Sequence, residues 1–509
     1  MKRIALPLFV FFLWFCACSQ QQVTDTLPRS VPEKEGVSSK SILNFVEAVE
    51  HSGQELHSFM LLRHGKVIAE GWWHPYRSDL KHTMYSTSKT FTSTAIGFAV
   101  SEGKLTVDDK VISFFPELLP DTVSDHLAAL RVKDLLCMAV GQNPEPIGIL
   151  RGSDWVKAFL AAPVVYEPGT RFLYNSVATY MLSAILQEVT GEKLIDYLTP
   201  RLFEPLSIKG ADWEVDPDGI NTGGWGLRVK TEDMAKLGQL YLQKGKWNQQ
   251  QILPETWIED ATTAQIMQKP DATDEEKATS DWVQGYGYQI WRCRPNAFRA
   301  DGAFGQYIIV MPEWDAVVAI TANVNNMQHE IDLVWKHLLP AFHSEQLPAD
   351  NKAVAALQQK LASLAIPPAK GIASAMEKQF PAKTSFAVDN GEDVLSLHFQ
   401  NDVCHFVMKM NAVEYSFAFG RETWKSGETT KPSAYIVPSP SNFVGLPPFE
   451  VCGSYCWNDE NTLSLTLRYI EGPHYDMYTL NFDGEQLTAA FSNSITPNRK
   501  TEWTGKRIE

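Results

Sequence analysis

The chain has 509 residues and a mass of 57.2 kDa, with 44% hydrophobic and 21% charged residues, so it can bury more than one hydrophobic core. This composition excludes disorder as the main state, and the length allows about two to four domains. The 60 acidic and 45 basic side chains give a formal net charge of -15. Such an acidic balance argues against a nucleic-acid backbone as the main partner.

The N-terminal segment has the composition of an export signal. Lys2 and Arg3 precede an apolar run over residues 4–15, which is too short for a folded transmembrane helix but typical of a secretory signal. The small Ala17 before Cys18 resembles the bacterial lipobox. We expect residues 1–18 to be a lipoprotein signal peptide with lipid attachment at Cys18; an ordinary signal peptide is the alternative. The predicted location is the bacterial cell envelope, at the periplasm or the outer membrane face.

Residues 19–35 are polar and contain proline, which predicts a tether between anchor and body. Because the body is acidic, the acyl chains would have to supply the membrane attachment. Five cysteines remain outside the signal, an odd number that allows no complete disulfide framework. They are Cys137, Cys293, Cys404, Cys452 and Cys456, and the last two could pair with each other or with Cys404. The sequence contains no CxxC motif, no His/Cys cluster and no phosphate-binding glycine loop. We therefore predict no metal and no cofactor.

Secondary-structure signals follow in chain order. Residues 56–63 and 66–73 are β-rich runs around His64-Gly65, which predicts a hairpin. Helical spacing of apolar residues then recurs in four segments. These segments are 90–100, 156–160, 177–189 and 231–242. Strand patterns return at 285–291, 306–311 and 316–321, and a helix is expected at 329–339.

Strands at both ends of this region, with helices between them, predict one antiparallel sheet closed by the two ends, with a helical subdomain at its edge. The fold class is thus α/β in the broad sense (α+β), over residues 36–345. Residues 346–374 are rich in Ala, Lys, Gln and Pro and predict a helix and linker. Residues 375–509 contain six or more short β-rich runs separated by Asn, Asp and Gly. They predict a small all-β sandwich or barrel.

Ser86 and Lys89 form a Ser-x-x-Lys pair at the start of the predicted helix at 90–100. Three residues make about one helical turn, so the hydroxyl and the amine face the same way. A lysine desolvated by the surrounding fold can lose its proton near neutral pH and accept the serine proton. The pattern also occurs at Ser78/Lys81 and Ser101/Lys104, but only Ser86 leads directly into a buried helix.

Four ordered motifs resemble the serine β-lactamase and penicillin-recognising family, especially its class C-like branch. Besides Ser86 and Lys89, residues 167–176 are similar to the PGTxFxYSN segment of that family. Residues 223–227 and 233–238 resemble its GGxGL and DxAKxG run, and residues 299–306 lie where the family has its third motif. The resemblance covers about residues 30–342 and implies a β-lactamase/transpeptidase-like fold.

The resemblance assigns a role to each matching position. Ser86 would be the acylated nucleophile, Lys89 its activating partner, and Tyr174 the phenol that moves a proton between them and the leaving group. The backbone N–H groups of Ser86 and Ala303 would form the oxyanion hole, with Ala303 on the edge strand after Gly302.

Two departures concern the substrate. Ser176 stands where the family often has an asparagine, and Asp301-Gly302 follows Ala300 where the family has Lys-Thr-Gly or His-x-Gly. We expect Ser176, Asp301 and Gly302 to contact the substrate. The usual cation for a substrate carboxylate is missing unless Arg299 or His82 replaces it, so an ester or amide without a terminal carboxylate fits at least as well.

The first hypothesis is therefore a cell-envelope serine hydrolase that cleaves a small-molecule or peptide ester or amide through a Ser86 acyl-enzyme. A D-amino-acid-specific cell-wall peptidase or a β-lactamase is the second. A non-catalytic, penicillin-binding-like sensor lipoprotein is the third, favoured by the altered third motif. The C-terminal domain could cap the active site, bind envelope glycans or stabilise the body. Substrate identity and oligomeric state stay open.

Overall fold

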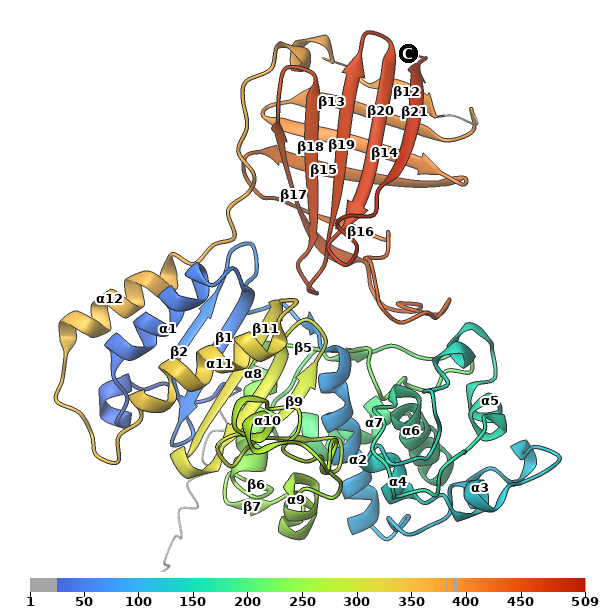
Figure 1. The fold of residues 1–509 in the computed structure, drawn as a ribbon. Coiled ribbons are helices and arrows are strands. Elements are labelled where there is room, and N and C mark those ends of the chain that lie inside the picture. The colour runs from blue at the N-terminus through green and yellow to red at the C-terminus, as the bar shows by residue number, and fades with distance from the viewer. Residues whose placement is uncertain (1–24, 381, 389–390, 509) are drawn as a thin grey trace, which may run out of the picture.

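The computed structural model describes residues 25–380, 382–388 and 391–508 (Figure 1). The predicted signal peptide, with Cys18, lies outside the described residues. The chain forms a mixed α/β body followed by a separate β-rich unit, in agreement with the predicted fold class. The β-rich unit stands above the body in the view of Figure 1 and contacts it through loops at its lower end.

The body is built on a six-stranded sheet whose strands pair antiparallel. In spatial order the strands are β2 (Lys66–Trp72), β1 (Glu55–Arg63), β11 (Ala316–Asn323), β10 (Gln306–Met311), β9 (Ala297–Gly302) and β8 (Trp291–Cys293). The first strands of the body thus pair with its last strands, as the sequence pattern predicts. The predicted hairpin is also confirmed, with both turn residues, His64 and Gly65, at positive φ.

Both faces of the sheet are buried. On β1, Met60 and Leu62 belong to one hydrophobic core, while Phe59 and Leu61 belong to the other. Alternate residues of a strand point to opposite faces, so this strand is apolar throughout. One face is covered by α1 (Ser39–His51), α11 (Met327–His337) and α12 (Asn351–Ala362). The other packs on α8 (Thr231–Leu242) and α2 (Ser88–Ser101).

A helical region extends from α2 at one side of the sheet (Figure 1). Its helices are α3 (Asp125–Ala129), α4 (Val132–Leu136), α5 (Trp155–Ala161), α6 (Ser176–Thr190) and α7 (Leu194–Leu198). Two further helices, α9 (Glu255–Thr262) and α10 (Asp274–Thr279), precede β8. A small sheet of β3 (His82–Thr83), β5 (Leu227–Val229) and β4 (Asp212–Trp213) leads into α2, and β6 (Lys246–Trp247) pairs with β7 (Gln250–Gln251).

The C-terminal unit is a closed barrel. Its strands are β12 (Thr384–Val388), β13 (Val394–Gln400), β14 (Val403–Met410), β15 (Val413–Arg421), β16 (Lys425–Thr429), β17 (Phe449–Trp457), β18 (Thr462–Tyr469), β19 (Tyr475–Asp483), β20 (Gln486–Asn493) and β21 (Thr501–Arg507). A parallel pairing of β15 with β17 closes the sheet. The barrel interior is filled by apolar and aromatic side chains. Of the two predicted all-β architectures, the structure has the barrel.

Two predicted segments differ from the structure. The expected strand at 285–291 is wrong: Gly285 and Gln289 have positive φ, so this stretch turns, and β8 begins only at Trp291. Residues 28–30 of the expected tether pair with the backbone of Val67 on the edge strand β2. The helix expected within residues 346–374 is confirmed as α12, which packs on α1 of the body.

The five cysteines outside the signal are all buried free thiols, so the pairings considered for Cys452 and Cys456 are not formed. In the described ranges, we find no group of three or more His, Cys, Asp or Glu side chains able to hold a metal ion. No helix in the same ranges combines the length and apolar character needed to cross a bilayer.

Candidate active site

Ser86 lies at the junction between the small sheet and α2. The backbone makes a single 3₁₀ turn over Tyr85–Thr87 and continues directly into the helix. The residues of α2 from Ser88 to Ala99 are buried, whereas Ser86 itself is partly exposed. A hydroxyl at the exposed end of a buried helix is open to a substrate while its supporting residues stay fixed.

Lys89 lies one turn after Ser86, as the second residue of α2, and is only 1% exposed. Its Nζ is 3.0 Å from Ser86 Oγ, 3.1 Å from Ser176 Oγ and 2.6 Å from the Gly224 carbonyl oxygen. A neutral lysine amine has two N–H donors and one lone pair. Donation to Gly224 and Ser176 would leave that lone pair directed at the Ser86 hydroxyl, which is the arrangement that a general base requires.

Burial lowers the pKa of Lys89 to about 7, although the nearby carboxylates of Glu145 and Asp301 partly oppose this shift. A substantial fraction of the amine is therefore neutral near neutral pH. The glycine at position 224 is needed for the close contact, since a Cβ there would lie 2.5 Å from the Ser176 carbonyl oxygen. This explains the Gly223-Gly224 motif in physical terms.

Tyr174 lies beside this pair, with its ring centre 5.0 Å from Lys89 Nζ. The ring stacks on Trp291 at 5.7 Å and meets Tyr286 edge-on at 6.4 Å. Desolvation raises the pKa of Tyr174 well above its ordinary value, and a hydrogen bond with Ser86 offsets part of that rise. The phenol therefore keeps its proton at neutral pH, so the structure favours Lys89 as the base and Tyr174 as a donor or relay.

Glu145 is a member of the site that the sequence did not indicate. Its Oε1 accepts hydrogen bonds from the backbone N–H groups of Ser176 (2.5 Å) and Val177 (3.3 Å), at the N-terminus of α6. A carboxylate is favourable at this end of a helix. Glu145 comes from an irregular loop rich in proline, where no periodic pattern marks it.

The third predicted motif forms the strand side of the site. Gly302 is the last residue of β9, and Ala303 begins the turn into β10. A Cβ on Gly302 would lie 2.3 Å from the carbonyl oxygen of Met84, so only glycine allows this turn to lie against the chain before Ser86. Ala303 was expected on the edge strand, but β8 is the edge strand of the sheet and pairs with residues 297–299 of β9.

Asp301, expected to contact substrate, is only 8% exposed, and its Oδ2 accepts from Arg299 Nε at 2.8 Å. Burial raises the pKa of Asp301, and the charges of Arg299 and Lys89 oppose the rise. Arg299 is fully buried and also donates to the Asp281 carbonyl oxygen at 2.9 Å. It is therefore not available to a substrate carboxylate.

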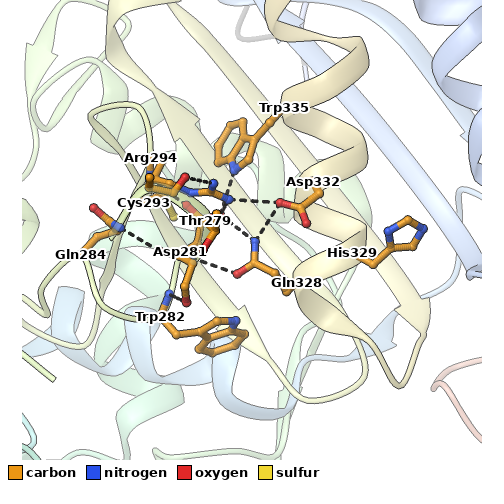
Figure 2. A network of polar contacts seen from close by, with 12 residues as sticks. Thr279, Asp281, Trp282, Gln284, Cys293, Arg294, Gln328, His329, Asp332 and Trp335 are labelled. Atoms are coloured by element: carbon orange, nitrogen blue, oxygen red, sulfur yellow. Dashed lines mark hydrogen bonds and ion pairs between the residues drawn. The ribbon is translucent and has the colours of Figure 1, made fainter. Parts of the chain in front are cut away.

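A buried polar network holds Asp281 in place (Figure 2). Its carboxylate accepts from the Arg294 backbone N–H (2.7 Å) and side chain (2.7 Å), and from Gln328 (2.8 Å) and Trp335 (2.9 Å) of α11. These contacts fix the segment that supports Arg299, and through it Asp301. The network is thus a support for the strand side of the site.

His82, the other residue considered for a substrate carboxylate, is buried away from this role. Its Nε2 lies 3.1 Å from Nδ1 of His57, and its Nδ1 lies 3.1 Å from the Thr83 carbonyl oxygen. Both ring nitrogens are occupied inside the protein. The described site therefore offers neither Arg299 nor His82 as the missing cation.

The site lies between an antiparallel sheet and a helical region. In it the hydroxyl of a serine meets a buried lysine of lowered pKa and a neutral tyrosine, and this arrangement defines a serine hydrolase. A family profile described as Beta-lactamase matches residues 47–339. The chain belongs to this Beta-lactamase family, and it is a serine hydrolase, as are its relatives.

Two curated relatives show how distant the similarity is. A 6-aminohexanoate-dimer hydrolase from Paenarthrobacter ureafaciens is 25% identical over 282 residues, which is 51% of this chain and 71% of the relative. A β-lactamase from Escherichia coli K12 is 22% identical over 311 residues, or 50% of this chain and 78% of the relative. A solved structure from Bacillus anthracis, described as a candidate 6-aminohexanoate-dimer hydrolase, has 21% identity and a TM-score of 0.51. The similarity covers 64% of this chain and 89% of the Bacillus anthracis chain, and it supports the fold alone.

Proposed function

We propose that this protein hydrolyses an ester or an amide without a terminal carboxylate through an acyl-enzyme on Ser86. The observation that carries the proposal is the contact between Ser86 Oγ and the buried amine of Lys89 at 3.0 Å. In the first step Ser86 Oγ bonds to the substrate carbonyl carbon while its proton passes to Lys89. The C–O or C–N bond then breaks, and the leaving group receives a proton by way of Tyr174.

Water completes the reaction. It attacks the acyl carbon and gives a proton to the Lys89 amine. Lys89 passes this proton to Ser86 Oγ as the bond between Ser86 and the acyl carbon breaks, which releases the acid and restores the serine hydroxyl. The oxyanion of both tetrahedral intermediates would be bound by the backbone N–H groups of Ser86 and Ala303. Ser176 holds the Lys89 amine rather than acting only on the substrate.

The preference for a substrate without a carboxylate rests on charge. Arg299 is paired with Asp301, His82 is buried against His57, and Glu145 adds a negative charge near Lys89. A terminal carboxylate would meet repulsion instead of a cation. The relative named as a 6-aminohexanoate-dimer hydrolase is consistent with amide cleavage, and the one named as a β-lactamase keeps lactam cleavage as the second candidate.

The test is the intact mass of the purified protein after incubation with an activated ester, a fluorophosphonate and a penicillin, with Ser86→Ala as the control. We expect adducts from the ester and the fluorophosphonate in the parent protein and none in Ser86→Ala. A penicillin adduct would favour the second candidate. No Ser86-dependent adduct from any of the three would favour the non-catalytic sensor and overturn the proposal.

We also propose that the protein is lipid-anchored to the cell envelope through Cys18. The support is the charged and apolar order of residues 2–15 and the Ala17-Cys18 pair. Growth with a radiolabelled fatty acid should label the parent chain and not Cys18→Ala. Equal labelling of the two would contradict this location.

A further inference from the structure

The barrel contacts the body directly beside the nucleophile, through the hairpin that joins β18 to β19. The Glu471 carbonyl oxygen accepts from the Thr83 backbone N–H at 2.9 Å and from the Thr83 hydroxyl at 3.1 Å. The Gly472 carbonyl oxygen accepts from the Tyr76 hydroxyl at 3.2 Å. The barrel therefore contacts the chain three residues before Ser86 through the backbone carbonyl group of Glu471.

Tyr85, which immediately precedes Ser86, is bound by the barrel on two sides. Its hydroxyl is 2.6 Å from Nε2 of His474, and its ring stacks on Tyr435 with centres 4.9 Å apart. Tyr85 is 1% exposed and has φ +48°, a left-handed backbone conformation that residues other than glycine rarely adopt. The residue before the nucleophile thus combines an unfavourable backbone conformation with side-chain contacts to the barrel.

Phe304, which immediately follows Ala303, meets the same histidine. Its ring packs edge-on against His474, with ring centres 4.7 Å apart, and is tilted against the ring of Tyr85 at 5.6 Å. It too has a positive φ, +66°. One imidazole of the barrel therefore contacts both the residue before Ser86 and the residue after Ala303.

The imidazole is itself fixed within the barrel. Its Nδ1 lies 2.9 Å from the Ser494 hydroxyl, which follows β20. Burial lowers the pKa of His474 to about 3, so the ring is neutral and has one donor nitrogen and one acceptor nitrogen. Each nitrogen has one partner, Tyr85 or Ser494, and the plane of the ring is set by both.

We propose that His474 is a positioning residue of the oxyanion hole, and that the barrel is by this contact a working part of the active site. The proposal rests on the proposed hydrolase function. His474 touches no reacting atom; it acts through Tyr85 and Phe304, whose strained backbones orient the amides of Ser86 and Ala303. Positioning of the oxyanion hole is a role of the C-terminal domain different from capping the active site, binding glycans or stabilising the body.

The experiment uses the full chain and compares the parent with His474→Ala, His474→Gln and Glu450→Gln. Steady-state hydrolysis of a small activated ester and the rate of fluorophosphonate labelling are measured, with thermal unfolding of each variant. The ester is small enough to make no contact with the barrel. The Glu450–Arg77 ion pair crosses the same interface at an exposed position (2.5 Å), so Glu450→Gln is the matched control.

We expect His474→Ala to lower kcat and the labelling rate about 10- to 100-fold with KM changed by less than about twofold, because misplaced amides weaken only the transition state. His474→Gln, which keeps a donor and an acceptor, should recover most of the loss. Glu450→Gln should stay within about twofold of the parent. A His474→Ala variant that folds and has the parent's kcat would overturn the proposal, as would an equal loss in Glu450→Gln.

If His474→Ala does not fold, Tyr85→Phe removes only the hydroxyl that meets the imidazole, and an unchanged kcat in that variant would overturn the proposal. Ser86→Ala is run in parallel. A parent protein without Ser86-dependent turnover would refute the proposed function itself. Ser86-dependent turnover that is insensitive to His474 would refute only the role of the barrel.

Discussion

Lys89 and Phe304 lie on the helical side and the strand side of the same candidate site, and different parts of the chain hold them. The partners of Lys89 come from the body alone, on or beside α2, α6 and the Gly223-Gly224 turn. Phe304 is held by its own turn and by the barrel. The groups that carry out the chemistry thus depend on the body, while the geometry around them also depends on a second unit. The following predictions separate these two contributions.

The largest effect is expected on the helical side. Lys89→Arg should lower kcat/KM by about 10³-fold or more, because arginine stays protonated and cannot accept the Ser86 proton. Ester hydrolysis measures the loss. Lys104→Arg, at another Ser-x-x-Lys of the same helix region, is the matched control and should have no measurable effect. A Lys89→Arg variant with activity close to the parent would exclude the lysine as the base.

Tyr174→Phe should lower kcat about 10²- to 10³-fold with little change in KM, since the ring still stacks on Trp291 but no proton can pass through it. Tyr286→Phe is the control, because this ring lies in the same aromatic cluster. We expect the control to stay within about threefold of the parent. Equal losses in the two variants would point to packing instead of proton transfer.

On the strand side, Gly302→Ala should lower kcat about 10- to 100-fold, because its Cβ would lie 2.3 Å from the Met84 carbonyl oxygen and the turn must move away from Ser86. Fluorophosphonate labelling reports the same change. Gly148→Ala, where no atom lies within 4 Å of the added Cβ, is the control. Unchanged labelling in Gly302→Ala would mean that this turn is not part of the site.

The smallest expected effect is a shift of the pH profile on changing Glu145. Because the pKa of Lys89 is lowered to about 7, kcat/KM should fall about tenfold for each pH unit below that value and level off above it. Glu145 raises the pKa of Lys89, so Glu145→Gln should move this limb to lower pH. A profile recorded from pH 5 to 9 for both proteins tests this. A limb that stays in place, or moves to higher pH, would contradict the assignment to Lys89.

Regular elements were predictable where the pattern is local. The helix at 231–242 and the strand at 306–311 have the predicted bounds, since apolar periodicity and sharp turns define them. The strand predicted at 285–291 was wrong. Its apolar residues alternate as in a strand, but the backbone turns at residues of positive φ, which periodicity does not reveal. Sandwich and barrel share a two-residue period, and only the distant β15–β17 pairing distinguishes them.

The candidate site shows the same division. Ser86, Lys89, Tyr174 and Ser176 lie in recognisable motifs, and the structure brings them together. Glu145 lies in an irregular loop and has no pattern of its own. The contact between Tyr85 and His474 joins two residues whose local sequences carry no common signal. Such a contact follows from the packing of two folded units.

Tyr85 and His474 are separated by 389 residues, and this separation sets an order of events during synthesis. At roughly 5–20 residues per second, a ribosome needs on the order of 20–80 s to pass from one to the other. The sheet of the body can close once β11 has emerged, because β11 pairs with β1. The residue before the nucleophile meets His474 only after the β18–β19 hairpin has been synthesised. The nascent chain therefore completes its fold around Ser86 late, when synthesis has almost reached the C-terminus.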